Sequence, residues 1–172
     1  MIPSGRFAAS SPIEGEEGAS HTPLAAERIW SVLNSVPDPE IPAISIVDLG
    51  IVRDVTFEDD TVVVAVTPTY SGCPATSLIN MEIETALRAH GFDKLRIERR
   101  ISPPWTTDWI SAEGRAKLNA YGIAPPDRNA PVACPRCGST ETSEVSRFGS
   151  TPCKAAWRCN ACLEPFDRFK CI

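Results

Sequence analysis

The sequence contains only two histidines, His21 and His90, and it lacks any long apolar run. A catalytic Cys–His pair is a poor fit, because His21 lies near the N-terminus and His90 lies at the far end of the helix expected after Cys73. A membrane-spanning helix needs about 18 or more consecutive apolar residues, and no stretch approaches that length. No glycine-rich loop of the phosphate-binding kind is present either. These absences exclude membrane insertion and disfavour nucleotide-binding and Cys–His enzymes.

The chain also lacks an excess of basic residues and a secretion signal. It has 17 Lys and Arg against 22 Asp and Glu, a net charge of −5 and a pI near 5.1. This net negative charge is opposite in sign to the basic surface expected of a protein that binds nucleic-acid phosphates. Residues 1–21 have neither a basic start nor an apolar core segment. We therefore expect a cytoplasmic protein whose seven cysteines are reduced.

The first two-thirds of the chain predict a tail and an α+β domain. Residues 1–21 are small, polar and acidic without periodicity, which predicts a disordered tail. Thr22 and Pro23 are typical of a helix start. Hydrophobic spacing predicts helices at 22–36, 74–90 and 111–121 and strands at 50–57, 61–67 and 95–101. This order predicts a small α+β domain over residues 22–123, with helices packed on a sheet.

Two of these elements carry specific burial expectations. The run Val62–Val66 lacks alternation, so it is expected to form a central strand buried on both faces. Strand 95–101 alternates apolar and charged residues, which predicts one solvated face. The buried face of the second helix is expected to consist of Leu78, Ile79, Ile83, Ala86 and Leu87.

The C-terminal part of the chain predicts a metal-bound ribbon. A proline-rich segment, 124–131, is expected to be a linker, and residues 132–172 hold six of the seven cysteines. A segment of about 40 residues rarely forms a stable hydrophobic core without disulfide bonds or a bound metal ion. Residues 144–148 and 155–158 flank Gly149 and Ser150 and predict a hairpin.

Two C-x-x-C pairs, separated by residues 138–158, give this ribbon its metal ligands, Cys134, Cys137, Cys159 and Cys162. A complete thiolate shell favours a structural ion over a catalytic one. Zinc is the preferred ion, iron in a rubredoxin-like centre is the alternative, and two disulfides or four free thiols are the other possibilities. Three cationic residues are candidates to offset the negative charge of the site: Arg136, Lys154 and Arg158.

Three further cysteines have open roles. Cys73 is predicted at a helix N-terminus, where the helix dipole should lower its pKa, or it is an inert packed residue. The carboxylates of Asp38 and Glu40 would join it in a polar pocket if their loop packs beside it. Asp48 and Thr67 are further candidates for that pocket. Cys153 and Cys171 are either small buried residues or a second pair of ligands for a transient metal or cluster.

Several motifs resemble the small MIP-type, SufT-like domain of iron–sulfur assembly factors. They are Asp38–Pro42, Val47–Val52 and Pro68–Pro74. Joined to a ribbon with Phe148–Lys154 and Glu164–Asp167, they resemble the PaaD family, accessory proteins of the bacterial phenylacetyl-CoA epoxidase. This resemblance covers nearly all of residues 22–172.

The resemblance implies a non-catalytic helper of aerobic phenylacetate breakdown. It would assist maturation of the iron–sulfur reductase component or the metal centres of the epoxidase through protein contacts. The family's functional cysteine corresponds to Cys73, and its acidic loop corresponds to Asp38 and Glu40. A transient iron–sulfur cluster would be compatible with this role.

Two other functions compete with this interpretation. Zinc ribbons often bind nucleic acids, but residues 131–172 carry only six basic against four acidic residues. A thiol-dependent enzyme would rest on Cys73 alone. An assembly factor is therefore the favoured function.

Overall fold

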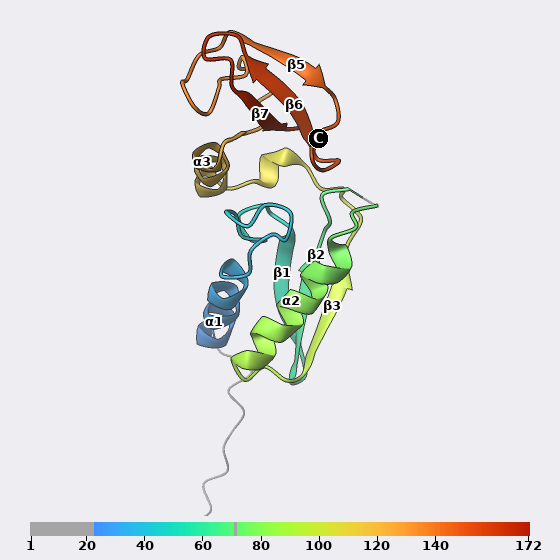
Figure 1. Cartoon of the computed structure of the whole chain (residues 1–172). Coiled ribbons are helices and arrows are strands. Elements are labelled where there is room, and N and C mark those ends of the chain that lie inside the picture. Colours follow the sequence, from blue (N-terminus) through green and yellow to red (C-terminus); the bar gives the residue numbers. More distant parts are fainter. Residues whose placement is uncertain (1–22, 71) are drawn as a thin grey trace, which may run out of the picture.

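The computed structural model describes residues 23–70 and 72–172 (Figure 1). The predicted tail at 1–21 and the Thr22 helix start lie outside this range. The helices are α1 (Pro23–Asn34), α2 (Thr76–Ala89), α3 (Ala112–Tyr121) and the short 3-10 helix η1 (Thr107–Trp109). The strands are β1 (Val52–Glu58), β2 (Thr61–Val66), β3 (Leu95–Arg99), β4 (Ile123–Ala124), β5 (Thr142–Ser146), β6 (Lys154–Cys159) and β7 (Pro165–Phe169). The predicted α+β class is confirmed.

The first sheet has the order β1-β2-β3, in which β1 and β2 are antiparallel and β2 and β3 are parallel. The central strand β2 is buried on both faces, as predicted, because every residue from Val62 to Val66 is buried. Val62, Val64 and Val66 belong to the main hydrophobic core. On the opposite face, Val63 and Ala65 alternate with them and are flanked by charged and polar residues of β1 and β3.

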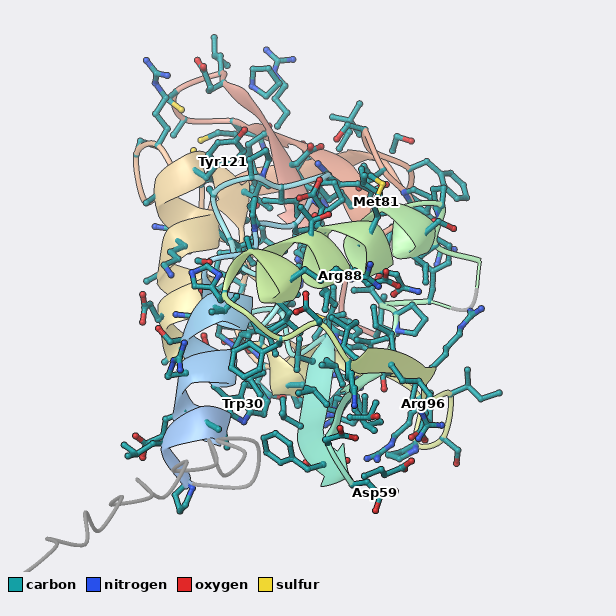
Figure 2. The ribbon with its side chains drawn as sticks, turned by 90° about the horizontal axis from the view of Figure 1, so that it is seen from below. Trp30, Asp59, Met81, Arg88, Arg96 and Tyr121 are labelled. Atoms are coloured by element: carbon teal, nitrogen blue, oxygen red, sulfur yellow. The ribbon has the colours of Figure 1, made fainter. Side chains whose placement is uncertain are left out.

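Helices α1 and α2 pack against each other, and α1 also contacts β1 (Figure 1). In α2, Ile79, Ile83 and Leu87 are buried at a helical spacing of four. Leu78 was predicted on this face, but it is 40% exposed. Leu78 precedes Ile79 by one residue, so its side chain is rotated by about 100° around the helix axis from that of Ile79. The outer face of α2 carries exposed residues such as Met81 and Arg88 (Figure 2).

Strand β3 is shorter than the sequence predicted. It ends at Arg99, and Ile101 is 69% exposed. The backbone N–H of Arg100 still donates to the Val66 carbonyl at 2.8 Å, but the chain then enters the segment that contains Pro103 and Pro104, which cannot donate to a sheet. The alternation of apolar and charged residues therefore placed the end of the strand two residues too late, at 101 instead of Arg99.

The second sheet has the order β4-β7-β6-β5. The predicted hairpin is confirmed, since β5 and β6 pair antiparallel. Strand β7 was not predicted, and it pairs antiparallel with β6 and parallel with β4. Ile123 and Ala124 thus connect the end of α3 to the sheet of the ribbon. The division of the chain into domains at 123 and a linker at 124–131 stays a prediction.

The ribbon lies next to the α+β part (Figure 1). One hydrophobic core contains residues of both parts. Phe169 of β7 is 1% exposed and lies beside Trp105, with ring centroids 6.0 Å apart. The Trp105 indole N–H donates to the Leu49 carbonyl at 2.9 Å. The backbone N–H of Thr107 and the side chain of Arg128 donate to the Ile172 carbonyl. These contacts hold the ribbon against the segment between β3 and α3, which Trp105 in turn connects to the loop before β1.

Within the described residues, no helix has both the length and the apolar character needed to cross a membrane.

Candidate functional site

The four ribbon cysteines converge on one point. The sulfur atoms of Cys134, Cys137, Cys159 and Cys162 all lie within 4.8 Å of one another. Cys134 Sγ lies 3.8 Å from Cys162 Sγ, and Cys137 Sγ lies 3.6 Å from Cys159 Sγ. Four thiolates at about 2.3 Å from a tetrahedral Zn²⁺ have sulfur–sulfur separations of about 3.8 Å. The donor set therefore fits a structural metal ion, zinc by preference.

Two turns position these thiols. Gly138 adopts a positive φ of 76°, and its N–H donates to the Cys134 carbonyl at 2.8 Å. On the other side, β6 delivers Cys159, and the backbone N–H of Cys162 donates to the Cys159 sulfur at 3.4 Å. That backbone N–H, with further contributions from the Ala161 N–H and the neighbouring thiols, lowers the pKa of the Cys159 thiol to about 7, while neighbouring thiols help to raise the pKa of Cys162. A ligand that ionises near neutral pH is suited to metal binding.

Two of the three expected cationic neighbours, Arg136 and Lys154, form ion pairs with carboxylates of the ribbon. Arg136 pairs with Glu164 at 3.2 Å. Lys154 is buried and its ammonium lies 3.5 Å from Asp167, so both charges are directed to carboxylates. These ion pairs depend on how the strands of the ribbon fold, and closeness in sequence does not predict them.

A second cluster lies where the ribbon meets the α+β part. One small, largely enclosed cavity is lined by the polar residues Asp38, Glu40, Thr69, Cys73 and Cys153, together with apolar walls from Ile41, Leu49, Ile51, Pro68, Ile79 and Phe169. The polar residues come from three segments: the loop after α1, the turn between β2 and α2, and the turn before β6. The structure thus brings Cys73 together with the acidic loop and adds a ribbon thiol.

Asp38 shapes the acidic loop. Its Oδ1 accepts hydrogen bonds from the backbone N–H groups of Glu40 at 3.0 Å and Ile41 at 2.8 Å. Burial raises the pKa of the Asp38 carboxyl, and these backbone hydrogen bonds partly counter the rise. Glu40 is half-buried, and burial followed by the nearby Asp38 raises its pKa. The loop therefore directs two carboxyl groups to a site with little solvent.

Cys73 lies three residues before the first residue of α2. Its pKa is raised, because burial and the carboxylates of Glu40 and Asp38 outweigh the hydrogen bonds that favour the thiolate. The predicted lowering by the helix dipole was therefore wrong. The dipole effect is confined to the first turn, and desolvation beside two carboxylates is the stronger effect here.

Cys153 is 4% exposed. Its sulfur lies 3.0 Å from the Thr151 hydroxyl and 4.0 Å from Glu40 Oε2. Burial raises the pKa of this thiol as well. The neighbouring Tyr70 hydroxyl has a raised pKa through burial, with further contributions from Cys73, Glu40 and Cys153. The acidic groups around Cys73 and Cys153 are therefore close enough to raise one another's pKa values.

Asp48 and Thr67 lie outside this cavity. Asp48 accepts from the Ser111 hydroxyl at 2.8 Å and from the Lys117 ammonium at 2.7 Å, which ties α3 to the loop before β1. Burial raises its pKa, but hydrogen bonds from Lys117, Ser111 and Ser45 outweigh burial and hold the pKa below its usual value. Thr67 is buried at the end of β2, where its backbone N–H donates to the Ile51 carbonyl.

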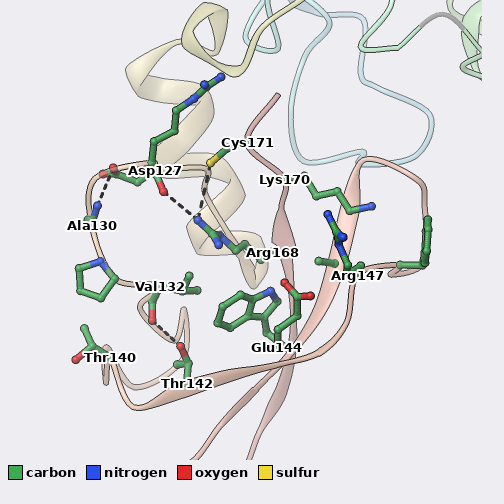
Figure 3. Close-up of a pocket in the computed structure, with 15 residues that line it drawn as sticks. Asp127, Ala130, Val132, Thr140, Thr142, Glu144, Arg147, Arg168, Lys170 and Cys171 are labelled. Atoms are coloured by element: carbon green, nitrogen blue, oxygen red, sulfur yellow. Dashed lines mark hydrogen bonds between the residues drawn. The ribbon is translucent and has the colours of Figure 1, made fainter.

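Cys171 lies apart from the cavity that contains Cys153. It lines a broad groove on the ribbon with Asp127, Trp157 and Arg168, and the Arg168 guanidinium contacts its sulfur at 3.8 Å (Figure 3). The two cysteines that the sequence suggested as a ligand pair therefore line different pockets.

Sequence reasoning missed Tyr70 and Thr151 as neighbours of the thiols. Tyr70 stands three residues before Cys73, and Thr151 stands two residues before Cys153. Both positions fall in turns that return toward the cysteine, so turn composition was the available signal.

Two protein-family models match separate parts of the chain. Residues 26–94 match the model of the iron–sulfur cluster assembly protein family. Residues 122–170 match the PaaD zinc beta ribbon domain.

Individual relatives match either almost the whole chain or about half of it. A protein of Escherichia coli, provisionally named as a component of the 1,2-phenylacetyl-CoA epoxidase, is 45% identical over 90% of this chain and 98% of its own. The Fe-S protein maturation auxiliary factor YitW of Bacillus subtilis is 34% identical over 54% of this chain and 91% of its own. The crystal structure of a domain of unknown function from Bacillus anthracis has a TM-score of 0.50 at 27% identity, covering 54% of this chain and 89% of that one. The combined assembly domain and ribbon, with similarity along almost the whole chain, show that this protein belongs to the PaaD family of phenylacetyl-CoA epoxidase proteins.

Proposed function

We propose that this protein is a non-catalytic maturation factor of the phenylacetyl-CoA epoxidase system. Its client would be a metal-containing component of that system, and the iron–sulfur reductase component is the first candidate. The protein would act through direct contact with the client and through the Cys73 thiol.

One observation carries the proposal: Cys73 and the carboxyl groups of Asp38 and Glu40 face a common cavity. Thiols and carboxyls are ligands for iron. The names of the relatives point in the same direction, since two of them are called Fe-S protein maturation auxiliary factors. The ribbon, with all four ligand positions supplied by cysteine, has the character of a structural site.

The proposal is tested in cells that grow on phenylacetate and lack this protein. The reductase component is purified without oxygen, and its iron and acid-labile sulfide are measured per chain. We expect both to fall well below the level in cells that carry the wild-type protein. Complementation with Cys73→Ala should fail to restore them.

Cys171→Ala is the matched control, because Cys171 lies in the ribbon groove outside the cavity. This variant should restore the iron and sulfide of the client. A reductase component with full iron and sulfide in the absence of the protein would refute the proposed client, and full rescue by Cys73→Ala would refute the role of the thiol.

A further inference from the structure

We propose that Cys153 of the ribbon and Cys73 of the assembly domain are ligands of a second metal site, in which Glu40 supplies a carboxylate oxygen to one thiophilic divalent cation. The site deepens the proposed function, because it names the species that the maturation factor would hold. It is distinct from the four-cysteine ribbon site.

The placement of the three groups supports this assignment. Cys73, Cys153 and Glu40 line the same cavity, although they stand far apart in sequence. The sulfur of Cys153 lies 4.0 Å from Glu40 Oε2, a separation that one ion between them can bridge with bonds of about 2.0–2.3 Å. Asp38 holds the loop that carries Glu40 through its bonds to the Glu40 and Ile41 N–H groups. Asp38 is therefore a positioning residue.

The size of the cavity favours a single ion. Its free volume is about 10 Å³, which is about the space of one water molecule. Two sulfurs and one carboxylate oxygen are a donor set for Fe²⁺, Co²⁺ or Zn²⁺, whereas Mg²⁺ and Ca²⁺ prefer oxygen alone.

The charge of the surroundings also suits a cation. Asp38, Glu40, Cys73 and Cys153 are acidic groups that line one cavity. The Lys154 ammonium acts electrostatically on Asp38, Glu40 and Cys153, but its direct ion pair is with Asp167, at 3.5 Å. Burying several acidic groups together is costly unless a positive charge compensates them. A divalent ion at the centre of this cluster would supply that charge.

The test uses the full chain with its ribbon site filled with zinc. Co²⁺ is then added without oxygen as a spectroscopic probe, and both metals are counted per chain after gel filtration. We expect one cobalt in addition to one retained zinc, with near-ultraviolet absorption from thiolate–cobalt bonds. Cys73→Ser and Cys153→Ser should each weaken cobalt binding at least tenfold and reduce this absorption by about half.

The control variant is Cys171→Ser, which should bind cobalt like the wild type. Zinc content and circular dichroism show whether each variant is folded. X-ray absorption at the cobalt edge of the wild-type protein gives a measurement that needs no variant, and it should find two sulfur neighbours and a shell of oxygen.

Absence of cobalt beyond the zinc site, or cobalt without sulfur neighbours, overturns the second site. Unchanged binding by folded Cys153→Ser overturns the role of the ribbon thiol. Client maturation is a separate readout: if Cys73→Ala abolishes it while the wild-type protein binds no second ion, the proposed function stands and this inference fails. If the ion binds as expected but the client matures without the protein, the site stands and the proposed client fails.

Discussion

Trp105 links the ribbon to the assembly domain through a single side chain. It is 3% exposed, contacts Phe169 and donates its indole N–H to the Leu49 carbonyl. We predict that Trp105→Phe lowers the free energy of unfolding by about 1–2 kcal/mol, because it removes a buried hydrogen bond while an aromatic ring is kept. Urea denaturation measures this change.

The matched control is Trp109→Phe. Trp109 is half-buried and stacks under the Arg53 guanidinium, 3.5 Å from its ring centre, and phenylalanine keeps a ring for that cation. The control should therefore cost less than Trp105→Phe. Equal losses in the two variants would show that the Trp105 hydrogen bond has no special part in the junction.

Asp48 makes stability depend on pH in a defined direction. Because hydrogen bonds hold its pKa below the usual value, its contribution is present above the unfolded pKa of about 3.9 and is lost as pH falls through the lower folded pKa. We predict that Asp48→Asn costs about 1 kcal/mol at pH 7, a value reduced by solvent screening at the partly exposed Lys117. At pH 3 the difference from the wild type should shrink.

Unfolding free energies at both pH values check this prediction. Asp60→Asn is the control, since Asp60 forms an exposed ion pair with Lys94, and such pairs contribute little. A difference between wild type and Asp48→Asn that stays constant from pH 7 to pH 3 would contradict the account.

At the scale of elements, the three strands β5, β6 and β7 depend on the metal. Residues 142–169 contain few buried apolar side chains, among them Ala155 and Phe169, while structural zinc contributes about 10–16 kcal/mol of apparent binding energy. We predict that Cys159→Ser loses stoichiometric zinc and melts these strands. Elemental analysis and circular dichroism measure the two effects.

Cys171→Ser is again the control, and it should keep one zinc per chain because Cys171 is outside the four-cysteine cluster. A Cys159→Ser protein that retains the wild-type spectrum and melting temperature would show that the ribbon folds without a complete thiolate shell.

Some helices and strands could be predicted from local patterns in the sequence, and others could not. The run Val62–Val66 predicted its strand and its burial, because its composition allows few alternatives. Ser111 and Gly122 gave the ends of α3 through its N-cap and its positive-φ stop. Strand β7 was missed, because the short segment from Pro165 to Phe169 lacks a clear alternation and is defined by its pairing with β6.

The candidate site was only partly predictable for a similar reason. The four ribbon cysteines followed from spacing alone. Cys73 followed from its place before a predicted helix, Asp38 and Glu40 were expected beside it only if their loop packed there, and the family resemblance pointed to the same three residues. The position of Cys153 depends on how the ribbon packs on the assembly domain through Phe169 and Trp105, and no local pattern encodes that packing. Sequence could therefore not distinguish Cys153 from Cys171.

For the whole molecule, the central claim is that the metal-bound ribbon forms one wall of the cavity that contains Cys73. Phe169 and Cys153 supply that wall, and both lie in the part of the chain that the ribbon metal organises. Removing the metal should therefore affect residues 38–41, although they are far from the zinc ligands in sequence.

Amide hydrogen exchange before and after zinc removal tests this claim most directly. We predict faster exchange for residues 154–159 and also for Asp38 and Ile41, whose N–H groups are bonded within the loop, while the paired amides of β1 and β2 stay protected. Unchanged exchange in residues 38–41 after the ribbon has lost its zinc and its structure would contradict the account.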